Sequence, residues 1–233
     1  MIKKLLVSLA VILLPSPAFL GRVAAQEVKL FPVDEASQNA SFKRFRDRLI
    51  AALRRRDRKY LLSVLHPRIM NSFGGNQGVK GFVEQWELNS PNSKIWTELM
   101  TILSMGGSFE EKGQKFYAPY VSSRWDTIEG RLPRSLDDAF CCGAVIGTKV
   151  EMHSRPDTSA PVLAVLSYDV VEVDHGASVD TATGQDLPWV KIKTFKNQDG
   201  YVRKGQFRSP TDYRASFRKI RGRWLMETLV AGD

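Results

Sequence analysis

The chain has 233 residues, of which 43% are hydrophobic and 25% are charged, and its formal net charge is +9. This length and balance are typical of a globular protein with one large or two small domains, and they exclude a fully disordered or low-complexity chain. The positive charge predicts attraction to anionic polymers or surfaces.

Residues 1–25 have the pattern of a secretory signal peptide. Lys3 and Lys4 precede an apolar run from Leu5 to Leu14, and small residues lead up to Ala25. The run is shorter than the ~20 apolar residues that span a bilayer, so we expect cleavage after Ala25 and no membrane segment in the mature protein. A retained membrane anchor is the alternative. Cleavage would leave 208 of the 233 residues and lower the net charge from +9 to +6, since three basic residues and no acidic one are removed. Export to the periplasm or the cell exterior makes nucleic acid a poor candidate partner.

The first part of the mature chain is predicted to be mainly helical. Phe42, Phe45, Leu49 and Leu53 recur at helical spacing and predict an amphipathic helix over residues 41–55. Further elements follow in chain order: helices at 58–65, 79–86 and 93–103, with a strand at 68–73 and a glycine-rich turn at 74–78. The turn lacks the Gly-Lys-Ser/Thr ending of a phosphate-binding loop.

Two separated segments are predicted to share a sheet. Residues 116–125 are expected to form a strand, which Pro119 restricts to an edge or a bulge, and 128–140 a linker. The alternating pattern of residues 213–230, with a turn at Arg221-Gly222, predicts a β-hairpin. Because an isolated hairpin is marginally stable in water, we expect it to pair with the strand at 116–125.

The region between them is predicted to be β-structure. Short β-branched or aromatic runs separated by turn residues occupy 162–166, 170–173, 189–193 and 201–202. Two stretches, Val150-Glu151-Met152-His153-Ser154-Arg155-Pro156 and Trp189-Val190-Lys191-Ile192-Lys193 with its turn at Gln198-Asp199-Gly200 before Tyr201-Val202, resemble the bacterial SH3-like (SH3b) domain. The resemblance implies a small β-barrel over residues 141–209 that binds or positions a ligand and does not catalyse. His153 stands where relatives usually have Arg, and Arg155 replaces a glycine, so the ligand loop departs from the usual pattern.

The flanking segments have a second resemblance. Phe42-x-x-Phe45-x-x-x-Leu49, Arg56-Asp57 and Gly222-x-Trp224 resemble the nuclear-transport-factor-like (SnoaL-like) cone. It implies an α+β domain built from residues 26–140 and completed by a hairpin at 210–233. The predicted fold class is therefore α+β, with an SH3-like β-barrel inserted in or following a small helical and β-sheet, cone-like domain. Over most of its length the chain also resembles a family of exported bacterial SH3-domain proteins of uncharacterised function.

Candidate ligand-binding residues are aromatic. The SH3-like resemblance places Tyr168, Trp189 and Tyr201 near the groove of that domain, where such rings stack on sugar or peptide, although Trp189 as plain packing stays an alternative. In the cone-like domain, six aromatic residues are candidates for lining a pocket: Trp86, Trp96, Tyr117, Tyr120, Trp125 and Trp224. Aromatic residues at such spacing more commonly belong to the core.

The sequence contains no strong signal for catalysis, a metal or a cofactor. The three histidines, His66, His153 and His175, are far apart, and none forms a metal-binding pair. The only cysteines, Cys141 and Cys142, are adjacent; we expect two small thiols at the start of the barrel, with a strained disulfide or an intermolecular bridge as alternatives. The pattern Ser216-x-x-Lys219 matches penicillin-recognising enzymes, but alternation predicts a strand with these two side chains on opposite faces.

We therefore expect a non-catalytic exported protein that binds cell-wall peptide, glycan or another envelope protein through its SH3-like domain. The alternative is a small-ligand carrier or an enzyme that uses a pocket in the cone-like α+β domain. The basic run at residues 54–59 is most simply a solvated helix face, and otherwise a docking patch for an anionic envelope polymer.

Overall fold

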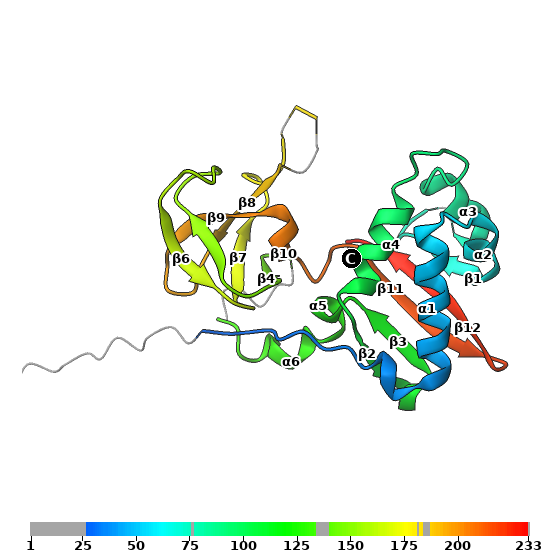
Figure 1. Ribbon diagram of the computed structural model, residues 1–233. Coiled ribbons are helices and arrows are strands. Elements are labelled where there is room, and N and C mark those ends of the chain that lie inside the picture. The colour runs from blue at the N-terminus through cyan, green and yellow to red at the C-terminus, as the bar shows by residue number, and fades with distance from the viewer. Residues whose placement is uncertain (1–26, 76, 134–139, 181, 184–186, 233) are drawn as a thin grey trace, which may run out of the picture.

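The computed structural model describes residues 27–75, 77–133, 140–180, 182–183 and 187–232. It contains helices and two mostly antiparallel sheets, so the predicted α+β class is confirmed (Figure 1). The predicted signal peptide and its cleavage site lie outside the described residues. None of the helices in the described part of the chain is long and apolar enough to cross a membrane.

A five-stranded sheet forms one part of the molecule. Its order is β1-β12-β11-β3-β2, with bounds β1 (Leu65–Met70), β2 (Ser108–Glu110), β3 (Lys115–Ala118), β11 (Arg214–Ile220) and β12 (Arg223–Val230). Only β1 and β12 are parallel. The predicted hairpin is confirmed, and so is its partner, because Ala215 pairs with Ala118 and Phe217 with Phe116.

The predicted strand at 116–125 is too long. It ends at Ala118, because Pro119 has no N–H to donate to a ladder and the chain turns into the short helix α5 (Tyr120–Ser123). The predicted strand at 68–73 begins earlier, at Leu65, so His66 and Pro67 belong to β1 and do not end a helix.

Four helices cover one face of this sheet (Figure 1). They are α1 (Ala40–Arg54), α2 (Arg58–Ser63), α3 (Gly78–Gln85) and α4 (Ile95–Ser104), preceded by the 3-10 turn η1 (Ala36–Gln38); a second 3-10 turn, η2 (Glu111–Gly113), follows β2. The Asn39 side chain accepts hydrogen bonds from the backbone N–H groups of Ser41 and Phe42, and this caps α1. Asp57 caps α2 in the same way, accepting from the N–H of Tyr60.

Aromatic rings fill the interior between α1 and the sheet. Phe42 is fully buried, and its ring centroid lies 4.2 Å from that of Phe116 and 4.9 Å from that of Trp224. The helical spacing of Phe42, Phe45 and Leu49 thus marks the buried face of α1, as predicted.

A seven-stranded antiparallel sheet forms the other part. Its order is β10-β4-β7-β8-β9-β5-β6, with bounds β4 (Cys142–Val145), β5 (Val150–His153), β6 (Val162–Leu166), β7 (Val170–Asp174), β8 (Trp189–Lys193), β9 (Asp199–Arg203) and β10 (Phe207–Arg208), the last reached through the 3-10 turn η4 (Lys204–Gln206). The sheet curves around its own apolar core, which includes Met152, Val190, Ile192 and Val202.

The predicted β-barrel is present only as a curved sheet, because the described strands do not close into a barrel. The two edge strands, β6 and β10, do not pair with each other. The result is an open, curved sheet.

Residues 27–34, the N-terminal strap, join the two parts. On the seven-stranded sheet, the N–H of Leu30 donates to the carbonyl of Tyr168 at 2.9 Å. On the other part, the N–H of Gly107 donates to the carbonyl of Val33, also at 2.9 Å. The strap, α5, α6 (Asp126–Glu129), β4 and β7 share one apolar cluster: Val28, Leu30, Tyr120, Val121, Trp125, Ile128, Cys142, Ala144 and Val170. The predicted linker at 128–140 therefore starts inside α6, and residues 134–139 lie outside the description.

Candidate functional site

A small hollow lined by one tryptophan lies on the outer face of β8 and β9. We call it the Trp189 hollow; it measures about 150 Å³ and is lined by Lys149, Glu151, His153, Thr158, Trp189, Arg203 and Gln206. The hairpin register places Arg203 directly opposite Trp189, and its guanidinium carbon lies 5.0 Å from the centre of the indole ring. The two groups therefore form a cation–π pair.

His153 supports the other side of the indole. Its ring contacts that of Trp189 edge-on, with centroids 5.5 Å apart. The imidazole is buried, and Nδ1 lies 3.0 Å from the carbonyl oxygen of Ala160, which only accepts, so Nδ1 carries the proton. Nε2 lies 3.5 Å from the Glu151 carboxylate. The ring is thus fixed in place and cannot rotate freely.

The structure places two of the three predicted ligand-binding residues on one face, although of these only Trp189 lines the hollow. Tyr201 pairs with Lys191 and with His153, so it lies on the same outer face as Trp189. Tyr168 is elsewhere: it occupies the turn between β6 and β7, and its ring contacts that of Phe31 at 5.6 Å. It does not line the Trp189 hollow.

Sequence inspection did not single out Arg203 and Lys149. Arg203 lies opposite Trp189 in a hairpin whose loop is residues 194–198. The predicted turn at Gln198-Asp199-Gly200 is wrong, because Asp199 and Gly200 belong to β9 and pair with Lys193 and Ile192. Lys149 lies two residues before Glu151 and four before His153, and all three line the hollow.

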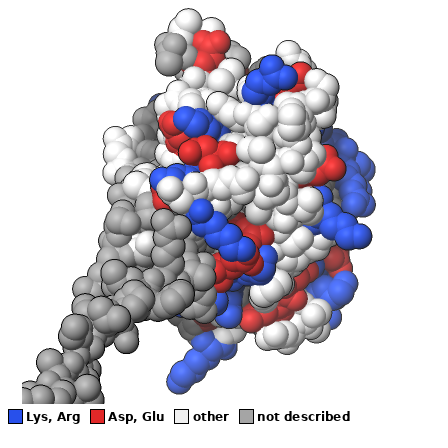
Figure 2. Space-filling model, turned by 90° about the vertical axis from the view of Figure 1, so that its left-hand side faces the viewer, with Lys and Arg blue, Asp and Glu red and all other residues white. Residues whose placement is uncertain are grey.

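Charges of both signs are mixed across the outer surface of the seven-stranded sheet. Figure 2 shows Lys and Arg interspersed with Asp and Glu on this side of the molecule. Lys191 lies 3.2 Å from the Asp174 carboxylate, and the backbone N–H of Ala177 together with this lysine lowers the pKa of Asp174. At the edge of the sheet, β6 exposes three apolar side chains: Val162, Leu163 and Val165.

The aromatic residues considered for a pocket in the α+β part are mainly core residues. Five of them are buried, with exposed fractions of 3–7%: Trp86, Trp96, Tyr120, Trp125 and Trp224. Tyr117 is partly exposed because it lies on the face of β3 opposite to Phe116. Tyr117 and Trp125 both line a cavity of about 370 Å³ on that face, together with Glu110, Asp126, Glu129 and Arg214.

An ion network crosses this second face of the five-stranded sheet. Glu227 lies 3.2 Å from the Lys115 ammonium and 3.0 Å from Nε of Arg218. Burial opposes the charge on Lys115, but its hydrogen bonds with Tyr117 and Glu227 outweigh burial and raise the pKa of the lysine. The Glu227 carboxylate therefore partly neutralises both Lys115 and Arg218.

The cysteines and histidines do not assemble into a reactive or metal-binding group in the part of the chain that the structure describes. Cys141 is exposed and Cys142 is buried in β4, and no disulfide joins them in the structure. His66 accepts a hydrogen bond from the N–H of Arg68, and His175 lies 2.6 Å from the carbonyl oxygen of Phe140. Across the described ranges, no three side chains of His, Cys, Asp or Glu gather as metal ligands.

Comparison with known proteins identifies no relative: no family model, no curated protein and no solved structure matches this chain.

Proposed function

We propose that this is a non-catalytic exported binding protein that engages cell-wall peptide or glycan, or another envelope protein, through an SH3-like sheet. The observation that carries the proposal is the partly exposed Trp189 ring, which Arg203 and the buried His153 hold in place on the outer face of β8 and β9. A ring fixed by its neighbours loses little entropy when a ligand stacks on it, so it is suited to binding.

The chemistry of the Trp189 hollow favours a ligand with a flat or sugar-like face and a negative group. The indole offers a stacking surface, and Tyr201 extends the aromatic face along β9. Lys149 and Arg203 supply two cations against one carboxylate, that of Glu151. Cell-wall glycopeptides combine these features, since they carry sugar rings and peptide carboxylates.

Two further observations support the assignment to an SH3-like domain and to export. The seven strands form one curved antiparallel sheet around a small core, and their hairpin of β8 and β9 contains the Trp189 and Gly200 positions of the sequence resemblance. The first 25 residues have the composition of a signal peptide.

A sedimentation assay with purified peptidoglycan tests the proposal. We expect the protein without its first 25 residues to sediment with peptidoglycan, and Trp189→Ala and Tyr201→Ala each to weaken binding by about tenfold, as is usual for a central aromatic contact. Phe73→Ala is the matched control, because it removes an aromatic ring that is 48% exposed in the α+β part. Absence of sedimentation, or equal loss in the control, would refute binding by this face.

The cavity of about 370 Å³ supports the second candidate, a small-ligand carrier or an enzyme acting in the α+β part. Its volume falls in the range of small-molecule sites, and its lining combines aromatic rings with carboxylates. Native mass spectrometry of the purified protein separates the two candidates: a bound small molecule that Tyr117→Ala displaces supports the carrier, and a mass equal to that of the chain alone opposes it.

A further inference from the structure

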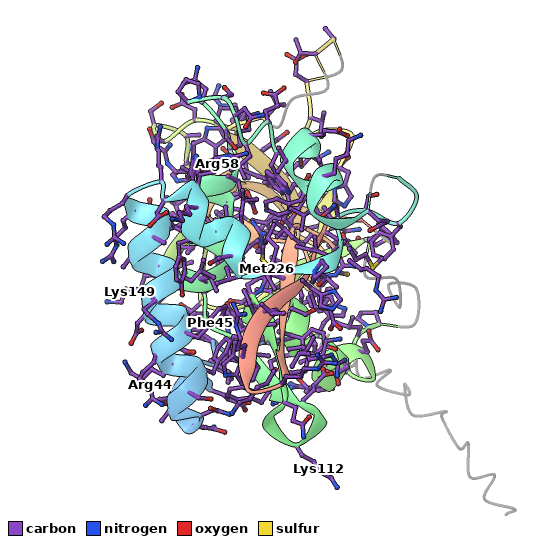
Figure 3. The ribbon with its side chains drawn as sticks, turned by 90° about the vertical axis from the view of Figure 1, so that its right-hand side faces the viewer. Arg44, Phe45, Arg58, Lys112, Lys149 and Met226 are labelled. Atoms are coloured by element: carbon purple, nitrogen blue, oxygen red, sulfur yellow. The ribbon has the colours of Figure 1, made fainter. Side chains whose placement is uncertain are left out.

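A second hollow, which we call the arginine groove, lies between α1, α2 and the turn that joins β11 to β12. It measures about 380 Å³ and is lined by Ser41, Arg44, Phe45, Arg48, Tyr60, Ser63, Val64, Gly222, Arg223 and Trp224. Figure 3 shows Arg44 and Phe45 on α1 beside the strands of the hairpin. The groove belongs to the α+β part and is separate from the Trp189 hollow.

The lining of the groove contains three guanidinium groups and no carboxylate. Four other hollows in the described part of the chain each include at least one Asp or Glu side chain in their lining. The difference matters because a carboxylate beside a cation competes with an anionic ligand, and no carboxylate lines this groove to compete for the three arginines.

Helical spacing brings the charges together on α1. Ser41, Arg44, Phe45 and Arg48 follow the i, i+3, i+4, i+7 pattern, so they form one stripe along the helix that faces the groove. Arg44 and Arg48 are an i,i+4 pair of like charges, which destabilises a helix by a few tenths of a kcal/mol. Arg223 approaches from the opposite side, next to the tight turn at Gly222.

Lys219 adds a further positive charge beside the groove, and Tyr60 adds a neutral hydroxyl to its lining. The Lys219 ammonium lies 3.3 Å from the Ser41 hydroxyl, which also accepts a hydrogen bond from the Trp224 indole at 3.0 Å. Tyr60 lies at the groove, where burial raises the pKa of its phenol although the charge and hydrogen bond of Arg48 oppose the rise. The phenol therefore stays neutral and available as a hydrogen-bond donor at neutral pH.

We propose that the arginine groove is a binding site for a small ligand that carries more than one phosphate group. Guanidinium groups bind phosphate oxygens through paired, planar hydrogen bonds, and several of them around one hollow favour a multiply charged anion over a single carboxylate. A volume of about 380 Å³ accommodates a diphosphate or triphosphate group with a small organic portion against Phe45 and Val64.

Calorimetric titration with tripolyphosphate tests this proposal on the full mature chain. We expect saturable binding that weakens as salt is raised, and a loss of at least tenfold in affinity in the triple variant Arg44→Gln/Arg48→Gln/Arg223→Gln. All three side chains are exposed, so the variant is expected to fold, and its circular dichroism and thermal unfolding will verify this.

The matched control is Arg54→Gln/Arg55→Gln/Arg58→Gln. This control also removes three positive charges, but from exposed positions near the junction of α1 and α2, outside the groove. We expect its affinity for tripolyphosphate to stay within about threefold of the parent, because long-range attraction is screened.

Four results would overturn the proposal. They are no binding of tripolyphosphate, an equal loss of affinity in both triple variants, equal affinity for citrate, and binding only to phosphatidylglycerol vesicles. The second result would assign attraction to net charge, the third would remove the preference for phosphate, and the fourth would transfer the role to a lipid surface.

Discussion

The hydroxyl of Tyr120 is expected to make the protein unstable at alkaline pH, and Tyr120→Phe is expected to remove this effect. Tyr120 is 3% exposed and belongs to the apolar cluster shared by the two parts of the molecule. Its hydroxyl has no hydrogen-bond partner among the described residues. Burial, together with the charge of nearby Tyr168, raises the pKa of Tyr120 from 10.0 to about 12.

The magnitude follows from the difference between the folded and unfolded states. Below pH 10 the phenol is neutral in both states, so it adds no dependence on pH. Between pH 10 and 12 the unfolded chain ionises while the folded protein keeps its proton, so the free energy of unfolding falls as pH rises. A shift of about two pKa units corresponds to about 2.7 kcal/mol at 1.36 kcal/mol per unit, most of which is lost by pH 11.5.

Tyr120→Phe keeps the ring and deletes the ionisable group. At pH 7 we expect the variant to be at least as stable as the parent, by up to about 1–3 kcal/mol, because a buried hydroxyl without a partner is costly. Between pH 10 and 11.5 the gap in favour of the variant should widen by about 1 kcal/mol per pH unit, below the limiting slope of about 1.4 kcal/mol per unit.

Urea unfolding followed by tryptophan fluorescence, at several pH values from 7 to 11.5, measures the gap. Other ionisable groups contribute equally to both proteins and cancel in the difference, and the range from pH 7 to 9 serves as the internal baseline. A gap that stays constant from pH 9 to 11.5 would refute the buried, neutral phenol, and a less stable variant at pH 7 would show that the hydroxyl does have a partner.

Three further changes test the packing. Phe42→Ala should lower the free energy of unfolding by about 3–5 kcal/mol in urea titrations, since Phe42 is fully buried among aromatic rings, and a loss under 1 kcal/mol would contradict that position. Gly143→Ala should cost about 1–3 kcal/mol in thermal unfolding, because an added Cβ would lie 2.2 Å from Cζ of Phe207; Gly205→Ala, with no atom within 4 Å, is the control, and equal effects would contradict the close contact. Asp169→Ala should loosen the N-terminal strap, because the Asp169 carboxylate accepts hydrogen bonds from the Lys29 ammonium at 2.8 Å and from the backbone N–H of Ser167 at 2.6 Å. Limited proteolysis is expected to cut the strap faster in this variant. An unchanged rate would argue against this anchor.

Several features followed from the sequence because they depend on short-range physics. The stripe of Phe42, Phe45 and Leu49 predicted the buried face of α1, since helical geometry alone places these residues together. The hairpin at 213–230 and its need for a partner strand followed from alternation and from the instability of an isolated hairpin. The grouping of Trp189 with Tyr201 came from the SH3-like resemblance, and the register of β8 and β9 places both on one face.

Errors arose where one residue interrupted a local pattern. The predicted strand at 116–125 continued past Pro119 because aromatic and β-branched residues follow it, yet proline cannot donate to the ladder and the chain forms α5. The strand β4, which contains Cys142, was missed because Cys-Gly-Ala-Val is short and has no alternation. Tyr168 was grouped with Trp189 by resemblance, but it sits in a turn against Phe31.

The sequence by itself determined the element types, the alternation that separates core from surface, and the pairing of a late hairpin with an early strand. The first two depend on side-chain periodicity, which acts over a few residues, and the third follows from the instability of an isolated hairpin. Only the tertiary structure decided that the seven-stranded sheet stays open, that the N-terminal strap joins both parts, and that Arg223 meets Arg44 and Arg48 across one groove. The strap and the groove join residues far apart in the sequence, and all three features depend on sheet curvature and packing, which no local pattern encodes.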